Sequence, residues 1–535
     1  MRFIGPSLPA DIDPSRVVPL MLDLVRKMEQ HVEIKKKARL LVVGSRCEPS
    51  DTSNYAPTAS ANLIRFTTAY AALTGSKLYK LDVKSAFLQS ARQLLEDTPE
   101  HELIVVRMSA QIADAVGLQP GYYYASPAVY GHEKAPQTWS RYAGNKIKNN
   151  MHMDNSVDPC LFTRVLSDGF VEAIALFVDD SLANSTLLVE EMSALFPCTY
   201  QELTVDRPFI FLCMRFCKYA DGSITIDLDD YVVKMLERYN MTEVKSVTTS
   251  LQPGTVFTEA SDFDLVDDAT KLRYQEMLGS VGFSKEFARP DTVSAYHQLS
   301  KFAHRPGVQH VDGIRHLFKY LNGARSRRLR YRPDGGGLYM YCDASYATDP
   351  DTRKSVSGVV VMLAGASVLW IGAKQPLVAT SSTHAEIQAY TLGAKENQME
   401  LKYAATFRIN ATIPPAPTSE LYSSFHTVPR MQLVPVDRVP VGEWKMPPTV
   451  MYVDSQPAIR SCVEHCITKG NRHLSIMEMY VRECVLSTKT VQLAYCPTNL
   501  MVADAMTKVL PRAPQGEHMC VMFGARSIID MVQAP

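Results

Sequence analysis

One short stretch limits the possible folds of this chain more than any other. Residues 175–183 read ALFVDDSLA, in which an apolar run leads directly into Asp179 and Asp180. A short apolar run of this kind predicts a buried strand, and two adjacent carboxylates at its end repel one another unless a cation neutralises them. The chain is therefore expected to form a sheet that holds two acids at the end of one strand.

A second segment offers a third acid. The sequence KLYKLDVKSAFL at 77–88 predicts a strand that ends near Asp82. If the two strands are neighbours, the three carboxylates converge, and oxygen-rich clusters suit Mg²⁺. Two such ions about 3.5–4 Å apart can serve phosphoryl transfer. The alternative is that Asp179 and Asp180 only stabilise a turn, because Asp favours turns through local hydrogen bonds.

The surrounding periodicity indicates the fold class. Apolar residues recur at helical spacing over 60–74 and 137–151, and the segments 36–44 and 171–179 have the pattern of strands. The order of helix, strand, helix and strand predicts an α+β layer rather than a regular parallel α/β repeat. At 535 residues the chain is expected to hold several such domains.

A second unit is expected after the glycine run at 335–337. Its predicted strands end at Asp343 and Asp454, and its predicted helices carry Glu386 and Asp504. Each acid also has a purely structural interpretation. Glu386 stands at capping-box spacing from the threonine three residues earlier, Asp454 precedes a predicted helix that it could cap, and Asp504 suits the first turn of a helix.

The charge of the whole chain does not attract a polyanion, but one local segment is strongly basic. Lys and Arg number 56 and Asp and Glu also number 56, so the whole chain is formally neutral. The segment 301–332 nevertheless holds nine basic residues against one acid, Asp312. Such a cluster favours phosphate contact, and the alternative is a solvated helix face. The candidate nucleic-acid contacts are Arg325, Arg327, Arg328 and Arg330.

Other features bear on the cellular environment. The 11 cysteines have irregular spacing and the chain starts without a secretory pattern, which predicts reduced thiols in an intracellular protein. The run Val356–Ala373 has enough apolar residues for a membrane span. Its valines and glycines favour a buried two-strand hairpin instead. No membrane association is therefore expected.

Three ordered segments carry a family resemblance: KLDVKSAFL at 80–88, AVYGHEKAPQTW at 128–139 and LFVDDSLA at 176–183. They resemble successive motifs of the reverse transcriptase of copia-type retrotransposons. Four later segments, CDASYATDPDTRKSVSG, ATSSTHAEIQAY, VMYVDSQPAI and PTNLMVADAMTKVL, resemble the ribonuclease H domain of the same polyprotein. The resemblance covers roughly residues 31–511.

The resemblance implies a right-hand polymerase with fingers, palm and a thumb-like connection, followed by a ribonuclease H-like mixed-sheet domain. In sequence order it implies an irregular N-terminal segment at 1–30, fingers and palm at 31–250, a helical basic thumb or connection at 251–337, a ribonuclease H-like domain at 338–511 with a Pro-rich insertion at 411–448, and a C-terminal tail at 512–535.

The resemblance also implies site residues. The catalytic and metal-binding acids are Asp82, Asp179 and Asp180 in the palm and Asp343, Glu386, Asp454 and Asp504 in the ribonuclease H domain. Each set is implied to hold two Mg²⁺ ions, with Mn²⁺ as the alternative ion. The implied nucleotide-binding residues are Lys37, Arg39, Val83, Lys84, Phe87 and Lys134. Phe87 is either a steric gate against the ribose 2′-hydroxyl or a core residue, and Lys37 and Arg39 either contact the triphosphate or are solvated.

The predicted function is that of an RNA-directed DNA polymerase with a fused ribonuclease H, as part of a retrotransposon polyprotein. Its implied partners are an RNA template, a DNA primer, an RNA–DNA hybrid and dNTPs, in a cytoplasmic particle or the nucleus. Two departures from the family pattern keep alternatives open: Lys134 replaces a glutamine, and Cys213 replaces a glycine. The alternatives are an impaired relic or domesticated nucleic-acid-binding protein, and a chain in which only the ribonuclease H half is active.

Overall fold

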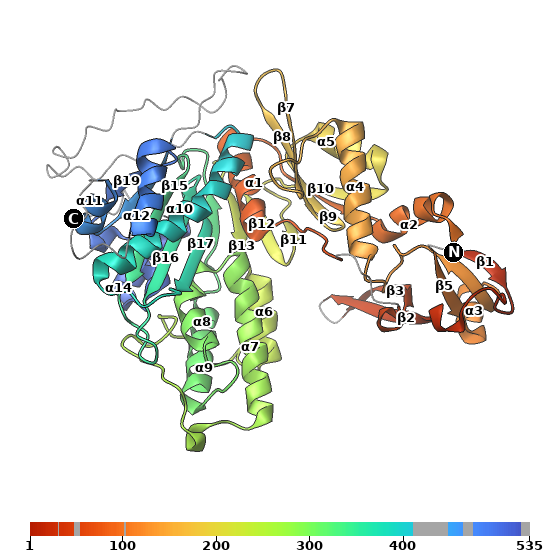
Figure 1. Cartoon of the computed structure of the whole chain (residues 1–535), viewed down its shortest axis with the longest axis horizontal. Helices are drawn as coiled ribbons and strands as arrows, with labels where there is room; N and C mark the ends of the chain where they lie inside the picture. Colours follow the sequence, from red (N-terminus) through yellow and green to blue (C-terminus); the bar gives the residue numbers. More distant parts are fainter. Residues whose placement is uncertain (30–31, 48–53, 101–102, 410–447, 464–474, 526–535) are drawn as a thin grey trace. The chain divides into compact units, whose positions relative to one another are not determined.

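The computed structural model of the chain describes residues 1–29, 32–47, 54–100, 103–409, 448–463 and 475–525 (Figure 1). They form two compact units. The first comprises Met1–Ala59, Leu81–Arg164 and Ala173–Tyr200, and the second comprises Ser60–Lys80, Val165–Glu172 and Gln201–Pro535. The predicted Pro-rich insertion at 411–448 lies almost entirely outside the described residues.

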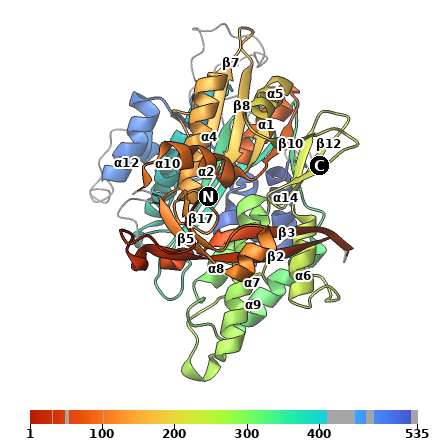
Figure 2. The ribbon, with the colours of Figure 1, turned by 90° about the vertical axis from the view of Figure 1, so that its right-hand side faces the viewer.

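The first sheet belongs to the first unit and has the strand order β1-β6-β5-β2-β3. Its strands are β1 (Arg2–Gly5), β2 (Val17–Glu29), β3 (Val32–Val42), β5 (Ile104–Met108) and β6 (Gly121–Ala125). β2 and β3 pair antiparallel along most of their length, and β2 also pairs parallel with β5. Figure 2 shows these two long strands lying side by side.

The expectation of an irregular segment at 1–30 is wrong, because β1 and the whole of β2 lie within it. The Pro-rich start of the chain suggested a loop. The following residues are nevertheless mostly apolar, and Val18 and Leu20 enter a small core with Val42 of β3 and Val106 of β5. Burial on one face of the sheet therefore outweighs the local preference of the first residues for loop structure.

The second sheet has the order β10-β4-β9-β8-β7. Its strands are β4 (Tyr79–Val83), β7 (Leu161–Val165), β8 (Val171–Phe177), β9 (Asp180–Ala183) and β10 (Cys198–Glu202). This order confirms the strand predicted to end near Asp82 and most of the strand predicted at 171–179, because β8 ends at Phe177, and it makes β4 a neighbour of β9. The acids that end these strands are thereby brought to one edge of the sheet.

Four helices complete the first unit: α2 (Ala86–Asp97), α3 (Ala110–Val116), α4 (Ala135–Met151) and α5 (Thr186–Leu195). α4 confirms the predicted helix at 137–151. Its buried residues include Trp139, Ala143, Ile147 and Met151, which recur every four residues and thus form one face.

The second unit begins with α1 (Ala61–Thr74), which confirms the helix predicted at 60–74. A third sheet follows, with strands β11 (Phe209–Phe211), β12 (Met214–Lys218), β13 (Ile224–Asp227) and β14 (Leu329–Tyr331) in sequential antiparallel order.

Helices α6 (Asp229–Arg238), α7 (Asp268–Phe287), α8 (Val293–Ser300) and α9 (Val308–Gly323) lie between β13 and β14 in the sequence. Both views of the ribbon show α7, α8 and α9 running beside one another (Figures 1 and 2). Their apolar faces share a core that includes Leu236, Tyr274, Val281, Ile314 and Phe318.

The fourth sheet has the order β17-β16-β15-β18-β19. Its strands are β15 (Tyr339–Ser345), β16 (Val356–Leu363), β17 (Ala366–Lys374), β18 (Thr449–Val453) and β19 (Val491–Tyr495). β15, β16 and β17 are antiparallel, whereas β18 and β19 run parallel to β15, so the sheet is mixed. The run Val356–Ala373 is the predicted buried hairpin.

Five helices accompany this sheet: α10 (Ser382–Thr406), α11 (Gln456–Val463), α12 (Ser475–Arg482), α13 (Asp504–Thr507) and α14 (Arg512–Met522). The chain is thus a mixed α/β protein with several sheets, as predicted. Within the described ranges no helix combines the length and the apolar character that a membrane crossing requires.

Arg65 joins three elements of the second unit. This side chain of α1 is 2% exposed and donates hydrogen bonds to the carbonyl oxygens of Val368 at 2.6 Å, Glu286 at 2.6 Å and Phe287 at 2.9 Å. Its guanidinium also lies 3.9 Å from the ring centroid of Trp370. These contacts replace the water that a buried charge would lose, so α1 is built into the same body as β17 and α7.

Candidate functional site

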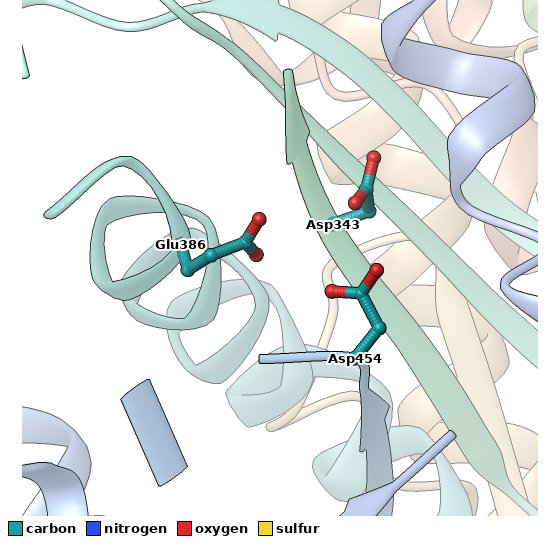
Figure 3. A group of neighbouring side chains, drawn as sticks. All are labelled: Asp343, Glu386 and Asp454. Carbon is teal, nitrogen blue, oxygen red and sulfur yellow. The ribbon is translucent and has the colours of Figure 1, made fainter. Parts of the chain in front are cut away.

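Three acids of the second unit point toward one another (Figure 3). Asp343 lies on β15, Asp454 directly follows β18, and Glu386 lies on α10. One carboxylate oxygen from each lies within 4.8 Å of the others. β15 and β18 are parallel neighbours, which brings Asp343 and Asp454 together although they are far apart in the sequence.

Asp504, the first residue of α13, also acts on this group. Burial is the main reason that the pKa of Asp343 is raised to about 8, and the charge of Asp504 together with a hydrogen bond between the two side chains adds to the rise. We refer to Asp343, Glu386, Asp454 and Asp504 as the buried cluster. The structure thus brings together all four acids that the sequence predicted for this unit.

The buried cluster is electrostatically unfavourable without a cation. Burial raises the pKa of Glu386 to about 10, and the charge of Asp343 adds to this rise. Burial also raises the pKa of Asp454. Glu386 Oε2 is buried and has no hydrogen-bond partner, which is unusual for a buried polar atom. Carboxylates that repel one another and retain a free oxygen fit a divalent cation.

Three neighbouring side chains orient the cluster. Thr507 Oγ1 donates a hydrogen bond to Asp343 Oδ2 at 2.8 Å, and Thr498 Oγ1 donates to Asp454 Oδ2 at 3.0 Å. Lys508 Nζ lies 2.7 Å from Asp504 Oδ1. The sequence-based reasoning did not identify these residues. Thr507 stands three residues after Asp504, a spacing that places both side chains on the same helix face and could have identified it, whereas Lys508 follows α13 in an extended conformation.

The helix-cap interpretations of two of these acids are wrong. The N-cap of α10 is Ser381, whose side chain accepts from the backbone N–H of His384. At α11, Ser455 Oγ accepts from the backbone N–H of Ala458 at 3.4 Å. Glu386 and Asp454 are therefore not needed for capping. Asp504 does occupy the first turn of α13, as its structural interpretation predicted.

The first unit holds the other three predicted acids, which we call the hairpin acids: Asp82, Asp179 and Asp180. Asp82 lies on β4, and Phe177 of β8 pairs with Asp180 of β9, so that Asp179 stands in the turn between them. The backbone N–H of Val83 donates to the carbonyl oxygen of Asp179 at 2.8 Å. Asp82 and Asp179 are exposed. All three are described, yet they do not form a group as tight as the buried cluster.

Predicted nucleotide-binding residues gather near the hairpin acids around Tyr130, which the sequence-based reasoning did not single out. The ring of Phe87 stands edge-on to Tyr130 with centroids 5.3 Å apart, and the guanidinium carbon of Arg39 lies 5.8 Å from the Tyr130 ring centroid. Burial raises the pKa of Tyr130, Arg39 lowers it, and Asp179 and Asp82 raise it, in that order of size. These groups are thus close enough to influence one another.

The loop after Tyr130 packs tightly on the end of β3. The backbone N–H of Val42 donates to the Tyr130 carbonyl at 2.9 Å. Gly131 has φ 89°, and a Cβ there would lie 2.1 Å from the Val42 carbonyl oxygen. Only glycine satisfies both conditions, which explains the Tyr-Gly pair of this motif and keeps Tyr130 beside Arg39.

The other residues predicted to contact the nucleotide are not shown to lie around Tyr130. The backbone N–H of Val83 is engaged by Asp179, and that of Lys84 donates to the Pro197 carbonyl at 2.8 Å. Lys134 is the N-cap residue of α4 and is partly exposed. Lys37 lies in β3, but its side chain falls outside the described part of the chain. Nucleotide contact by these residues stays a prediction.

The predicted nucleic-acid contacts all have partners within the second unit: Arg325 with Asp229, Arg327 with Asp291, Arg328 with Tyr219 and Arg330 with Asp221. The Arg325 and Arg330 pairs have nitrogen–oxygen distances of 2.9 and 2.6 Å. Part of the positive charge of the segment 301–332 is therefore offset inside the fold, and its contact with phosphate stays a prediction.

Comparisons with known proteins show which family and which proteins this chain resembles. The family model described as reverse transcriptase (RNA-dependent DNA polymerase) matches residues 8–253. This match includes all three hairpin acids and ends before the buried cluster begins.

Similar proteins extend over more of the chain. The retrovirus-related Pol polyprotein from transposon TNT 1-94 of Nicotiana tabacum is 23% identical over 492 residues, which are 90% of this chain and 33% of that protein. The Pol polyprotein from transposon RE1 of Arabidopsis thaliana is 25% identical over 486 residues, 89% of this chain and 29% of that protein. A putative transposon Ty5-1 protein of Saccharomyces cerevisiae is 29% identical over 277 residues, 51% of this chain and 87% of that protein. The chain therefore spans about a third of each Pol polyprotein.

Proposed function

Because the chain belongs to the reverse transcriptase family of copia-type retrotransposon polyproteins, we propose that it copies RNA into DNA at the hairpin acids. The observation that carries this proposal is the placement of Asp82 and Asp179 on adjacent backbone segments joined by the Val83–Asp179 hydrogen bond. Asp82 and Asp179 would hold two Mg²⁺ ions, with Mn²⁺ as the alternative, and Asp180 would be a third ligand. Such ions stabilise the charge that develops during phosphoryl transfer.

The residues around Tyr130 fit the incoming nucleotide in this proposal. Phe87 and Tyr130 present aromatic surface next to the acids, and Arg39 carries a positive charge toward the same place. A guanidinium suits a triphosphate because it offers several N–H donors in a fixed plane. Phe87 would then exclude the ribose 2′-hydroxyl, and Lys134 would act as a second cation for the phosphates.

We further propose that the buried cluster cleaves the RNA strand of an RNA–DNA hybrid. A mixed sheet of three antiparallel strands and two parallel ones, with acids from β15, α10, the end of β18 and α13, supports a ribonuclease H-like domain. Two Mg²⁺ ions held by these acids would position water for attack on the phosphodiester. Thr507 and Thr498 would keep Asp343 and Asp454 turned toward these ions.

One experiment tests the polymerase proposal and the main alternative together. Purified chain is given an RNA template, a DNA primer, dNTPs and Mg²⁺, and single-nucleotide extension is compared with that of an Asp179→Asn/Asp180→Asn variant. We expect extension by the wild type and a loss of about 10³-fold in the variant, because electrostatic stabilisation in an active site contributes this much. Salt-sensitive binding of the hybrid with no extension by either protein would support the alternative of a non-catalytic nucleic-acid-binding protein.

Hybrid cleavage is measured on the same preparations. Asp343→Asn should abolish cleavage of the RNA strand, and the hairpin variant should retain it. Cleavage without extension in the wild type would mean that only the ribonuclease H half is active.

A further inference from the structure

The turn that carries Asp179 has an unfavourable backbone conformation. Val178 and Asp179 form a two-residue loop between β8 and β9, because Phe177 pairs with Asp180. Val178 has φ 55°, which lies in the left-handed region and is rare for a β-branched residue. Hairpin loops with a positive φ at this position usually have glycine there. Another contact must therefore hold the turn.

Trp139 of α4 provides that contact. Its indole Nε1–H donates a hydrogen bond of 2.6 Å to the carbonyl oxygen of Val178. The side chain is 1% exposed, and its ring stands edge-on to Phe196 with centroids 5.5 Å apart. A buried indole fixed in this way keeps its N–H in one direction.

The residue held by this arrangement is Asp179. The Val178 carbonyl before it is fixed by Trp139, and its own carbonyl oxygen accepts from the backbone N–H of Val83 at 2.8 Å. Both peptide groups that flank Asp179 are thus anchored, and the direction of its side chain follows from them. Since Val83 directly follows Asp82, the same bonds set the position of one acid relative to the other.

We propose that Trp139 is a positioning residue, which fixes the Val178–Asp179 peptide so that the carboxylates of Asp82 and Asp179 bind divalent cations together. This inference rests on the proposed function only in assigning cation binding to the hairpin acids. Trp139 does not touch the nucleotide in this proposal and acts through the turn.

Trp139→Phe tests this role, because it keeps most of the ring packing and removes the N–H donor. Residues that orient metal ligands typically change metal affinity or activity by about 10–100-fold. We expect the kcat of single-nucleotide extension to fall by about this factor. The KM for the dNTP should change much less, since an interaction lost in the transition state lowers kcat without weakening substrate binding.

Cation binding is measured separately from activity. The full chain with Asp343→Asn and Asp454→Asn, which weaken the buried cluster, is titrated with Mn²⁺ and followed by electron paramagnetic resonance. Adding Trp139→Phe to this parent should raise the Kd for Mn²⁺ at the hairpin acids by about 10–100-fold.

Trp370→Phe is the matched control. It removes a buried indole N–H bond of similar length, from Trp370 Nε1 to the Lys285 carbonyl at 2.8 Å, in the second unit. Mn²⁺ affinity at the hairpin acids should not change in this variant. Val178→Gly added to Trp139→Phe should restore part of the affinity, because glycine adopts a left-handed conformation at little cost.

Each outcome decides the proposal. Wild-type kcat and Mn²⁺ affinity in Trp139→Phe would overturn it, and so would a loss no larger than that in Trp370→Phe. A parent that binds no Mn²⁺ at the hairpin acids would also overturn it. If Trp139→Phe weakens Mn²⁺ binding although no variant extends a primer, the positioning role holds and the polymerase function fails. No restoration by Val178→Gly would refute the role of the strained turn.

Discussion

The hairpin acids and the buried cluster have the same chemistry in opposite surroundings. Asp82 and Asp179 are exposed to solvent in the first unit, whereas Asp343 and Glu386 of the second unit are 3% and 8% exposed. Water screens the repulsion between the exposed carboxylates of the first group. The buried carboxylates lack this screening, and their pKa values rise instead.

This difference changes what a cation does at each site. At the buried cluster a bound cation would stabilise the fold as well as serve the proposed cleavage, because it would offset repulsion between acids in a poorly solvated place. At the hairpin acids, geometry is the more demanding requirement. There the hydrogen bonds from Trp139 to the Val178 carbonyl and from Val83 to the Asp179 carbonyl hold the backbone next to Asp82 and Asp179.

The largest effect that separates the two sites should appear as a pH dependence of stability without divalent ions. The folded-state pKa values of Asp343 and Glu386, about 8 and about 10, exceed the ordinary values of 3.8 and 4.5. Between about pH 4 and pH 8 the folded state therefore binds more protons than the unfolded state. The contribution of these protonated acids to the free energy of unfolding is therefore present at low pH and is lost as the pH rises toward 8. The loss is up to about 1.4 kcal/mol per pH unit for each proton that the folded state binds in excess of the unfolded state.

Hydrogen exchange of β15 and β18 in EDTA, at several pH values and corrected for intrinsic exchange, measures this loss. Mg²⁺ should reduce the pH dependence, and so should Asp343→Asn. Asp179→Asn is the control, because its carboxylate is exposed, and it should leave the exchange of β15 unchanged. Stability that rises with pH in EDTA would contradict the assignment of proton-binding acids to the buried cluster.

Thr507→Val should have a smaller effect, confined to the buried cluster. Valine lacks the hydroxyl that donates to Asp343 Oδ2 at 2.8 Å and has a similar volume. We expect hybrid cleavage to fall by about 10-fold and the Mg²⁺ concentration for half-maximal cleavage to rise by a similar factor. Thr507→Ser retains the hydroxyl and should cleave nearly as the wild type does. Primer extension should be equal in all three proteins, and a parallel loss of extension would indicate general destabilisation.

Much of each site was predictable because its acids follow apolar runs. A strand pattern that ends in an acid predicts both the element and the place of the side chain, as it did for Asp82, Asp179, Asp343 and Asp454. Features decided by tertiary contacts could not be predicted in this way. Nothing local in the sequence shows that Trp139 reaches Val178, or that one group of acids is buried and the other exposed.

The N-terminal segment and α1 show the same limit at the level of the fold. β2 was missed although residues 17–25 are mostly apolar, because the prolines before it suggest a loop. α1 was predicted correctly as a helix, but its sequence does not show that Arg65 would join it to β17 and α7. Periodicity predicts a helix or strand and the face of it that is buried. Which other element packs against that face depends on the whole chain.

Lys508→Met should give the smallest of these effects. Lys508 Nζ lies 2.7 Å from Asp504 Oδ1, and its ammonium offsets part of the negative charge of the buried cluster. The side chain is 44% exposed, so solvent screens the pair, and we expect a loss of only about 0.5–1 kcal/mol in EDTA. Mg²⁺ should reduce this loss, because a bound cation takes over the neutralisation. Lys508→Arg keeps the charge and should match the wild type in unfolding measurements. A loss of the same size with and without Mg²⁺ would mean that Lys508 stabilises α13 through packing of its aliphatic part. Neutralisation by a cation would then contribute less to the stability of the buried cluster than we propose.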